Sequence, residues 1–366
     1  MYRDTHTNST ERYEYIDIAK GLCMLAVVWG HLMLAGASNR LAYAFHIQAF
    51  FFLSGMLFRQ EKHKSLLCFA KHRAKTLLLP YAAFSLVTWT YWALRCTLLH
   101  IEVRSYWKPL AQTVLAQGSA GFLVHNVALW FVTCLFVVET LYYFLCKLPP
   151  WATALMCALC GGAGYWMVQP HSFFDLKLLP WSIEAAMTGV VFYGAGNLFV
   201  RKFPLSVLYT AVLRRKGIGA ALAGAAAVLL LLLGPRNGHV TIAQGSLGDC
   251  LFLFYLNGLL GVAAVLLFSV LLSDSLSLSQ GILTKPVAWL SWIGKNSFYA
   301  MAIHIPVMVD VVWIFSHFTQ QGMDALRTSW RFTFPEFLLI LLLTSLWIWA
   351  LGRARRYFKS RRFLLF

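Results

Sequence analysis

The sequence predicts an all-α fold: a polytopic membrane helical bundle of about ten transmembrane helices with both termini in the cytoplasm. The prediction rests on composition, on the length of the apolar runs and on the placement of the basic residues. Of 366 residues, 59% are hydrophobic and 12% are charged, and the mean hydropathy of +0.65 is far above that of a soluble enzyme. We expect a cytoplasmic N-terminal segment over 1–15, one membrane domain over 16–352 and a basic cytoplasmic tail over 353–366.

The apolar runs are long enough to cross a bilayer, which takes about 20 residues of helix. In chain order the predicted spans are 16–35, 41–58, 77–98, 123–146, 151–168, 181–200, 217–234, 249–272, 293–315 and 334–352. The second span is short but ends in the apolar run FFFLSGMLF. The connections between spans are too short to fold as soluble domains with cores of their own.

The basic residues decide the orientation. With the N terminus inside, 23 of the 31 lysines and arginines lie on the cytoplasmic side, mainly in segments 59–75, 201–216 and 353–366. Cytoplasmic connections of membrane proteins carry such an excess of basic residues. The same asymmetry accounts for the net charge of +17, so we expect a lipid bilayer and no nucleic acid as partner.

The cysteines do not indicate a metal site or a disulfide framework. The eight cysteines lie mostly in apolar runs, and Cys157 and Cys160 form a C-x-x-C without a second pair or a histidine at zinc spacing. Buried cysteines of this kind pack as small apolar residues. We therefore expect no metal and no structural disulfide.

The first span carries three ionisable side chains, Asp17, Lys20 and His31. The eleven residues from Lys20 to His31 rotate the helix by three full turns and about 20°, so the two side chains share a face. Asp17 lies about 40° from His31 around the same helix. Ionisable groups inside a span usually face an interior cavity and mark function. Alternatively, Asp17 and Lys20 are ordinary interface residues, and His31 meets water near the outer end.

The second span adds His46 and Ser54. A tight connection makes this span antiparallel to the first, so His46 can approach His31 at the same membrane depth. The alternative is a core histidine that hydrogen-bonds to a neighbouring helix.

A basic cluster precedes the third span and consists of Lys71, Arg73 and Lys75, with Pro80 in the first turns of the helix. Basic side chains at the start of a cytoplasmic helix suit a phosphate, because the helix N-terminus adds its own partial positive charge. Alternatively, the cluster acts only as a signal that sets the membrane topology.

Polar side chains within the later spans predict a bundle with a wet interior. As candidate substrate contacts we take Trp130, Glu139 and His304, together with His46 and Ser54. For any one of them, a helix-to-helix hydrogen bond is the alternative role.

Several motifs follow one another in a specific order. They are D-x-x-K-G…G-H from Asp17 to His31, then FHIQAFFFLSG, the basic segment that ends in LPY, then LWF, and finally IGKNS…H. In this order and spacing they resemble membrane acyltransferase family 3, and within it the fucose 4-O-acetylase-like O-acyltransferases. The resemblance extends over about 13–351, nearly the whole chain.

The resemblance implies a multi-pass enzyme of the bacterial inner (plasma) membrane that O-acylates a carbohydrate acceptor, often with cytoplasmic acetyl-CoA as the acyl-CoA donor. Members carry a basic residue, ten intervening residues and an essential histidine in the first helix, as Lys20 and His31 do; many have arginine at the position of Lys20. We expect His31 to act as the base for the acceptor hydroxyl, because burial keeps an imidazole neutral, or to carry the acyl group covalently. Lys20 would hold the donor, or position the catalytic face through Asp17.

Many members also have an arginine pair before the third helix, which Lys71, Arg73 and Lys75 match loosely. This cluster would bind the phosphates of CoA. The alternative function is a transporter or flippase for a glycan or a lipid-linked intermediate, because a wet bundle with interior histidines also suits transport. Many transporters have paired broken helices at matching positions in two halves, and the sequence shows no such pairing. A third possibility is an inactive relative in an assembly, which the presence of His31 disfavours.

Overall fold

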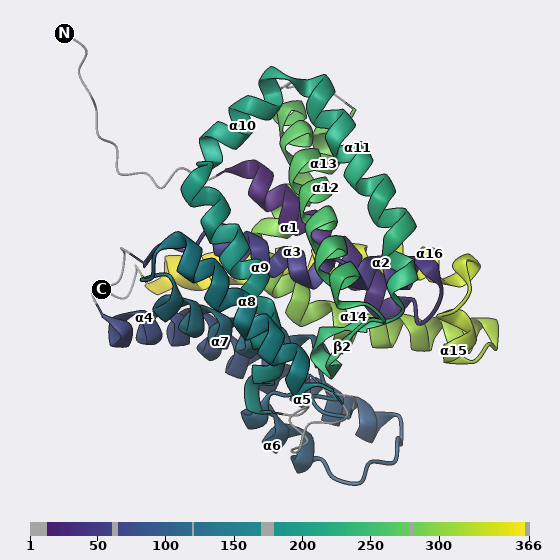
Figure 1. The fold of residues 1–366 in the computed structure, drawn as a ribbon. Helices are drawn as coiled ribbons and strands as arrows, with labels where there is room; N and C mark the ends of the chain where they lie inside the picture. The colour runs from purple at the N-terminus through teal and green to yellow at the C-terminus, as the bar shows by residue number, and fades with distance from the viewer. Residues whose placement is uncertain (1–12, 61–64, 119–120, 170–178, 278–281, 363–366) are drawn as a thin grey trace.

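A computed structural model describes residues 13–60, 65–118, 121–169, 179–277 and 282–362 (Figure 1). The predicted terminal segments 1–15 and 353–366 therefore lie partly outside the described residues. Within the described ranges the chain is almost entirely helical, which confirms the predicted all-α class. The α-helices are α1 (Glu14–Leu32), α2 (Ala37–Tyr43), α3 (His46–Met56), α4 (Leu66–Arg73), α5 (Leu79–Leu98), α6 (Trp107–Leu115), α7 (Trp130–Leu145), α8 (Pro150–Met167), α9 (Ile183–Lys202), α10 (Leu205–Arg214), α11 (Lys216–Leu233), α12 (Leu251–Ser277), α13 (Thr284–Lys295), α14 (Ser297–Thr319), α15 (Met323–Leu326) and α16 (Trp330–Arg362).

Short elements join these helices. A π-helical turn, η2 (Ala74–Leu78), makes α4 and α5 continuous. Between α11 and α12, a small antiparallel hairpin pairs β1 (Val240–Thr241) with β2 (Ser246–Leu247). The 3₁₀ turns are η3 (Val127–Leu129), η5 (Pro180–Ser182), η6 (Gly234–Asn237) and η7 (Ile242–Gln244).

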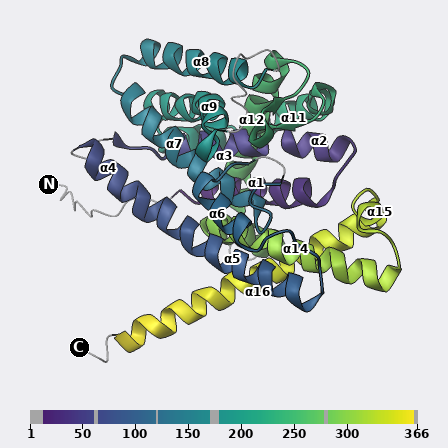
Figure 2. The ribbon, with the colours of Figure 1, turned by 90° about the horizontal axis from the view of Figure 1, so that it is seen from below.

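Helix α1 lies at the centre of the bundle. In Figure 2, α8, α9, α11 and α12 lie on one side of it, and α14, α15 and α16 lie on the other. Its closest neighbour is α13, where a Cβ atom added at Gly294 would meet the carbonyl oxygen of Asp17, and one added at Gly21 would meet that of Leu290. Glycine allows two helix backbones to approach this closely in a membrane bundle. The packing therefore fixes the position of the helix that carries Lys20 and His31.

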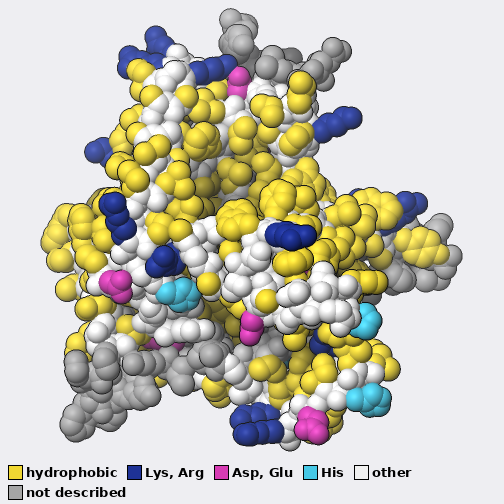
Figure 3. All heavy atoms as spheres, turned by 90° about the vertical axis from the view of Figure 1, so that its right-hand side faces the viewer, with side chains coloured by type: hydrophobic (Ala, Val, Ile, Leu, Met, Phe, Trp, Pro, Cys, Tyr) yellow, Lys and Arg dark blue, Asp and Glu magenta, His cyan; other side chains and the backbone are white. Residues whose placement is uncertain are grey.

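Eight helical runs within the described residues are long and apolar enough to cross a membrane, as expected of a multi-pass membrane protein. They are Glu14–Leu32, Leu66–Leu98, Val127–Leu145, Pro180–Lys202, Lys216–Asn237, Leu251–Leu276, Ser297–Thr319 and Trp330–Tyr357. Hydrophobic side chains cover most of the upper half of the face shown in Figure 3, as a lipid-facing surface requires.

The predicted spans 41–58 and 151–168 are not among these eight runs. The first is divided into α2 and α3, because Phe45 leaves helical geometry with φ −143° and ψ −25°. The second is α8, which is 18 residues long and contains three glycines that reduce its hydropathy.

Both of these segments nevertheless run from one end of the bundle to the other. α2 begins beside the end of α1, where Asn39 donates to the Gly30 carbonyl, and α3 ends where Phe58 accepts a hydrogen bond from Asn197 of α9. α8 starts near the end of α9 and finishes with Val168 against Gly245 of the hairpin turn. These two segments therefore follow the predicted path, but only the eight long runs of the described residues meet the criteria of length and apolarity, and the count of ten spans stays a prediction.

The start of α1 and the last part of α16 lie at the same end of the bundle. Lys295 Nζ lies 3.3 Å from Glu14 Oε1, and the guanidinium of Arg355 lies 4.7 Å from the ring centroid of Tyr299. At the opposite end, Arg327, between α15 and α16, contacts the last turn of α1. The arrangement is consistent with termini on one side of the membrane; that this side is the cytoplasm stays a prediction.

Candidate active site

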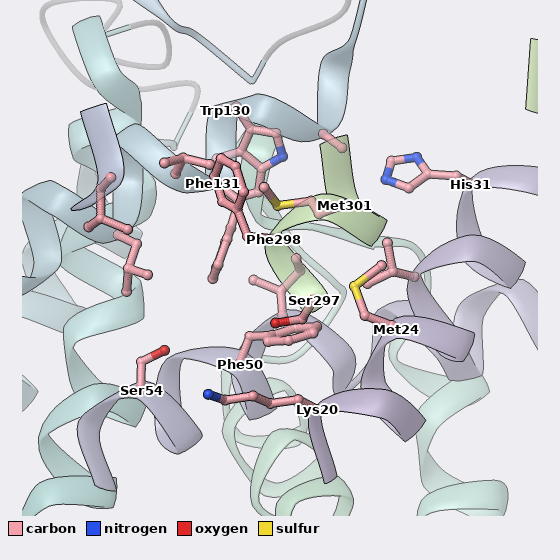
Figure 4. Close-up of a pocket in the computed structure, with 16 residues that line it drawn as sticks. Lys20, Met24, His31, Phe50, Ser54, Trp130, Phe131, Ser297, Phe298 and Met301 are labelled. Atoms are coloured by element: carbon pink, nitrogen blue, oxygen red, sulfur yellow. The ribbon is translucent and has the colours of Figure 1, made fainter. Parts of the chain in front are cut away.

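A cavity of about 190 Å³ lies along one face of α1. Lys20, Met24, Val27 and His31 line it and recur every three or four residues, so they form one helical stripe. In Figure 4, Lys20 and Ser54 lie at one end of this cavity, while His31 and Trp130 lie at the other. The spacing of Lys20 and His31 thus predicted their common face correctly. The rise of the helix separates their Cα atoms by about 16 Å.

The middle of this cavity is apolar. Side chains from four helical segments close it between the two polar ends: Ile47, Phe50, Leu77, Phe131, Phe298 and Met301. Such a lining suits a slender ligand with few charges along its length, held at its ends by polar groups.

A second cavity, of about 140 Å³, begins on the other side of His31. Tyr43 and His46 line it, together with Gly118 and the segment 240–244 of the hairpin. The two cavities share His31, Ile47 and Trp130. The imidazole of His31 therefore lies at the border between two spaces that different parts of the bundle line.

Three histidines gather at this border. The ring of His304 lies 5.4 Å from that of His31, and the ring of Tyr43 lies 6.3 Å from His31 and 5.1 Å from His46 (centroid distances). The predicted approach of His46 to His31 is therefore present, with Tyr43 packed against both rings. In the described part of the chain, no three His, Cys, Asp or Glu side chains are arranged to hold a metal ion.

Backbone carbonyls set the tautomers of two of these histidines. His46 Nδ1 lies 2.6 Å from the Ala42 oxygen, and His304 Nδ1 lies 3.1 Å from the Ala300 oxygen. Because a carbonyl oxygen only accepts, each Nδ1 carries the proton, and each neutral ring keeps its lone pair on Nε2. Both rings can therefore accept a proton or a hydrogen bond at Nε2.

Two side chains that sequence reasoning missed hold the end of α1. Asn39 donates to the carbonyls of Gly30 and Met33, and Arg327 donates to those of His31 and Leu32. These are the carbonyls that a helix C-terminus leaves without helical partners. Burial lowers the pKa of the Arg327 guanidinium, but arginine stays charged at any physiological pH. No local sequence signal distinguishes Arg327 from the other basic residues in the connections that are predicted to lie outside.

A family model described as an acyltransferase domain matches residues 13–361. The chain belongs to membrane acyltransferase family 3. The match covers nearly the whole chain, as the order of the motifs predicted. Neither the curated proteins nor the solved structures gave a match to the chain.

Two predicted site residues of this acyltransferase meet each other away from the α1 cavity. Arg73 Nη2 lies 2.7 Å from Glu139 Oε1; the Glu139 side chain is 3% exposed and that of Arg73 is 25% exposed. The family resemblance predicted a role for Arg73 in binding CoA, and the polar side chains within the spans predicted a role for Glu139 in binding substrate. The structure shows that the two side chains form an ion pair between α4 and α7, and their binding roles stay predictions.

The other predicted residues of the acyltransferase differ in their surroundings. Lys71 and Lys75 are exposed near the junction of α4 and η2, and neither lines the α1 cavity, although Leu77 of the same turn does. Asp17 is buried against α13 and lies outside the lining of that cavity. Lys20, Ser54, His31 and Trp130 therefore form the cavity site, with His46 and His304 beside it.

Proposed function

We propose that this protein is an integral membrane O-acyltransferase that moves an acyl group, most simply acetyl, from acyl-CoA to a hydroxyl of a cell-surface glycan or glycan precursor. The observation that carries the proposal is the position of His31 at the border of two cavities. Transfer between two substrates requires one group that both can reach, and family membership supplies the reaction class.

The donor would occupy the α1 cavity. Its thioester arm would enter at Lys20 and Ser54 and extend past the apolar middle to His31. Lys71 and Lys75, exposed at the start of the continuous Leu66–Leu98 run, would contact the CoA phosphates. Because Arg73 is paired with Glu139, we assign to it the positioning of this basic segment rather than a direct phosphate contact.

The acceptor would occupy the second cavity. Its lining is more polar than the middle of the first cavity and includes Tyr43, His46, Thr241 and Gln244. Hydroxyl, imidazole and amide groups of this kind suit a sugar, which needs donors and acceptors at fixed places. On the predicted orientation this cavity faces the outer side of the membrane, so donor and acceptor would approach His31 from opposite sides.

His31 would accept the proton of the acceptor hydroxyl as its oxygen attacks the thioester carbonyl carbon. The tetrahedral intermediate then expels the CoA thiolate, which takes the proton from the imidazolium, leaving an ester and a free thiol. The covalent route, in which the imidazole first receives the acyl group and releases the thiolate, is compatible with the same geometry. His304 and His46 would act next to His31 as acceptors at Nε2.

The test compares His31→Ala with His317→Ala, which replaces an exposed histidine of α14. Wild type and both variants are produced in cells that lack the gene, and surface glycans are analysed by mass spectrometry for acyl esters. Purified proteins are then offered radiolabelled acetyl-CoA. We expect ester formation with wild type and His317→Ala and none with His31→Ala, at equal helix content in far-UV circular dichroism. Wild-type turnover by His31→Ala would remove His31 from the mechanism, and glycan movement across vesicles without ester formation would favour the transporter.

A further inference from the structure

A third cavity, separate from the two at His31, lies where α3 ends and α9 meets α10. Its volume is about 610 Å³, within the range of small-molecule sites. Its polar lining includes Arg59, Gln60, Asn197, Arg201 and Ser206, and Phe58 belongs to its apolar lining. None of the described residues that line it is acidic. The cavity therefore combines two guanidinium groups with hydrogen-bonding and apolar surface.

The third cavity lies on the opposite side of α3 from the proposed donor site. Ser54 lines the α1 cavity, whereas Met56, two positions later, lines the third cavity. Side chains two positions apart on a helix point about 200° away from each other. A ligand in the third cavity would therefore be distinct from an acyl chain extending toward His31.

Hydrogen bonds fix the walls of the third cavity. Asn197 donates to the carbonyls of Gly55 and Phe58, and so attaches α9 to the end of α3. Arg201 Nη2 donates to the Cys146 carbonyl at 3.3 Å, which leaves further guanidinium N–H groups for a ligand. These contacts hold Arg201 near the rim before any ligand binds.

The start of α10 adds a second source of positive potential. Leu205 and Ser206, the first residues of this ten-residue helix, line the cavity, and Tyr15 Oη donates to the Leu205 carbonyl at 3.1 Å. The first N–H groups of a helix have no partners within the helix and favour anions. Arg59, Arg201 and Ser206 of the lining belong to the segments 59–75 and 201–216, which the charge count assigns to the cytoplasmic side.

We propose that the cavity at Arg59, Arg201 and Ser206 is a binding site for a phosphate-ester anion at the cytoplasmic face. Arginine forks match phosphate oxygens, and basic pockets between membrane helices at this depth bind lipid head groups. The apolar wall around Phe58 accommodates the rest of an amphiphilic ligand. The same chemistry would take an anionic phospholipid or a soluble phosphate, and the test separates these two sources.

The experiment uses the full-length protein in dodecyl maltoside and follows the thermal unfolding midpoint. One series adds phosphatidylglycerol, with phosphatidylcholine as the zwitterionic control. The other adds sodium pyrophosphate, with sodium chloride at matched ionic strength. The variant R59Q/R201Q removes both charges from the cavity, and R214Q/R215Q removes two exposed charges at the end of α10 as the matched control.

For the wild type we expect stabilisation by phosphatidylglycerol, by pyrophosphate or by both. Phosphatidylglycerol alone would identify a lipid, and pyrophosphate alone a soluble ligand. R59Q/R201Q should need about tenfold more ligand for the same stabilisation, and R214Q/R215Q less than about twofold more. R59Q alone, which leaves the Arg201–Cys146 contact intact, should show a several-fold loss. No stabilisation of the wild type, or equal responses of the two double variants, would overturn the proposal.

Discussion

The ion pair between Arg73 and Glu139 gives a prediction that separates a structural role from donor binding. The two side chains meet at 2.7 Å, and the carboxylate is 3% exposed. Replacing Arg73 by methionine leaves this carboxylate without the guanidinium that neutralises it. Removing one partner of a fully buried pair costs about 3–5 kcal/mol, and the partial exposure of Arg73 reduces the expected cost here to about 2–3 kcal/mol.

The double variant Arg73→Met/Glu139→Met should be more stable than Arg73→Met, because it buries no charge. The coupling between the two sites should reach at least about 1.5 kcal/mol. The measurement is equilibrium unfolding in mixed micelles of SDS and dodecyl maltoside, followed by far-UV circular dichroism. Lys75→Met, at an exposed position of η2, serves as control and should change the free energy of unfolding by less than about 0.5 kcal/mol.

The kinetic result decides between the two roles. We expect those Arg73→Met molecules that remain folded to show little change in KM for acyl-CoA. A variant as stable as the wild type with a strongly raised KM for acyl-CoA would refute the reasoning, because Arg73 would then contact the donor and contribute little to the fold.

Two further substitutions test the surroundings of α1. Gly294→Ala places a Cβ against the Asp17 carbonyl and should reduce the free energy of unfolding by about 1–3 kcal/mol in the same mixed-micelle assay. The control is Gly352→Ala on α16, which has open space around it and should be neutral or slightly stabilising. Equal stabilities of Gly294→Ala and the wild type would show that α1 and α13 can move apart without cost. Arg327→Gln weakens the hydrogen bonds to the last turn of α1, so it should lower kcat about tenfold with little effect on KM for acyl-CoA. Arg327→Lys should recover the activity, and the control Arg331→Gln should have no effect. A change in KM alone would argue against positioning of His31.

The sequence predicted those features of the site that depend on local periodicity. The common face of Lys20 and His31 follows from the helical repeat, and the approach of His46 follows from the short connection after α1. The pairing of Arg73 with Glu139 and the contact of Arg327 with His31 join residues far apart in the chain. Such pairs depend on which helices pack together, which the period of one helix does not encode.

The break between α2 and α3 was equally inaccessible from the sequence. No glycine or proline marks Phe45, where the helix is interrupted. The family resemblance located the basic cluster as a motif, but it did not show that Glu139 neutralises part of it. The second cavity was missed because part of its lining comes from the hairpin segment 240–244, which has no pattern that distinguishes it from an ordinary connection.

The interrupted α2–α3 segment has a consequence for biosynthesis. α3 alone, with 11 residues, is about 16 Å long, well short of the roughly 30 Å of hydrocarbon. Within the hydrocarbon layer, non-helical backbone is tolerated only where other protein covers it. Gly261 of α12 lies directly against Phe45, yet the ribosome makes it roughly two hundred residues later. Nascent chains released before α12 should therefore be degraded by membrane quality-control proteases faster than chains that extend through Ser277, which cover Phe45 but still lack α13 against α1.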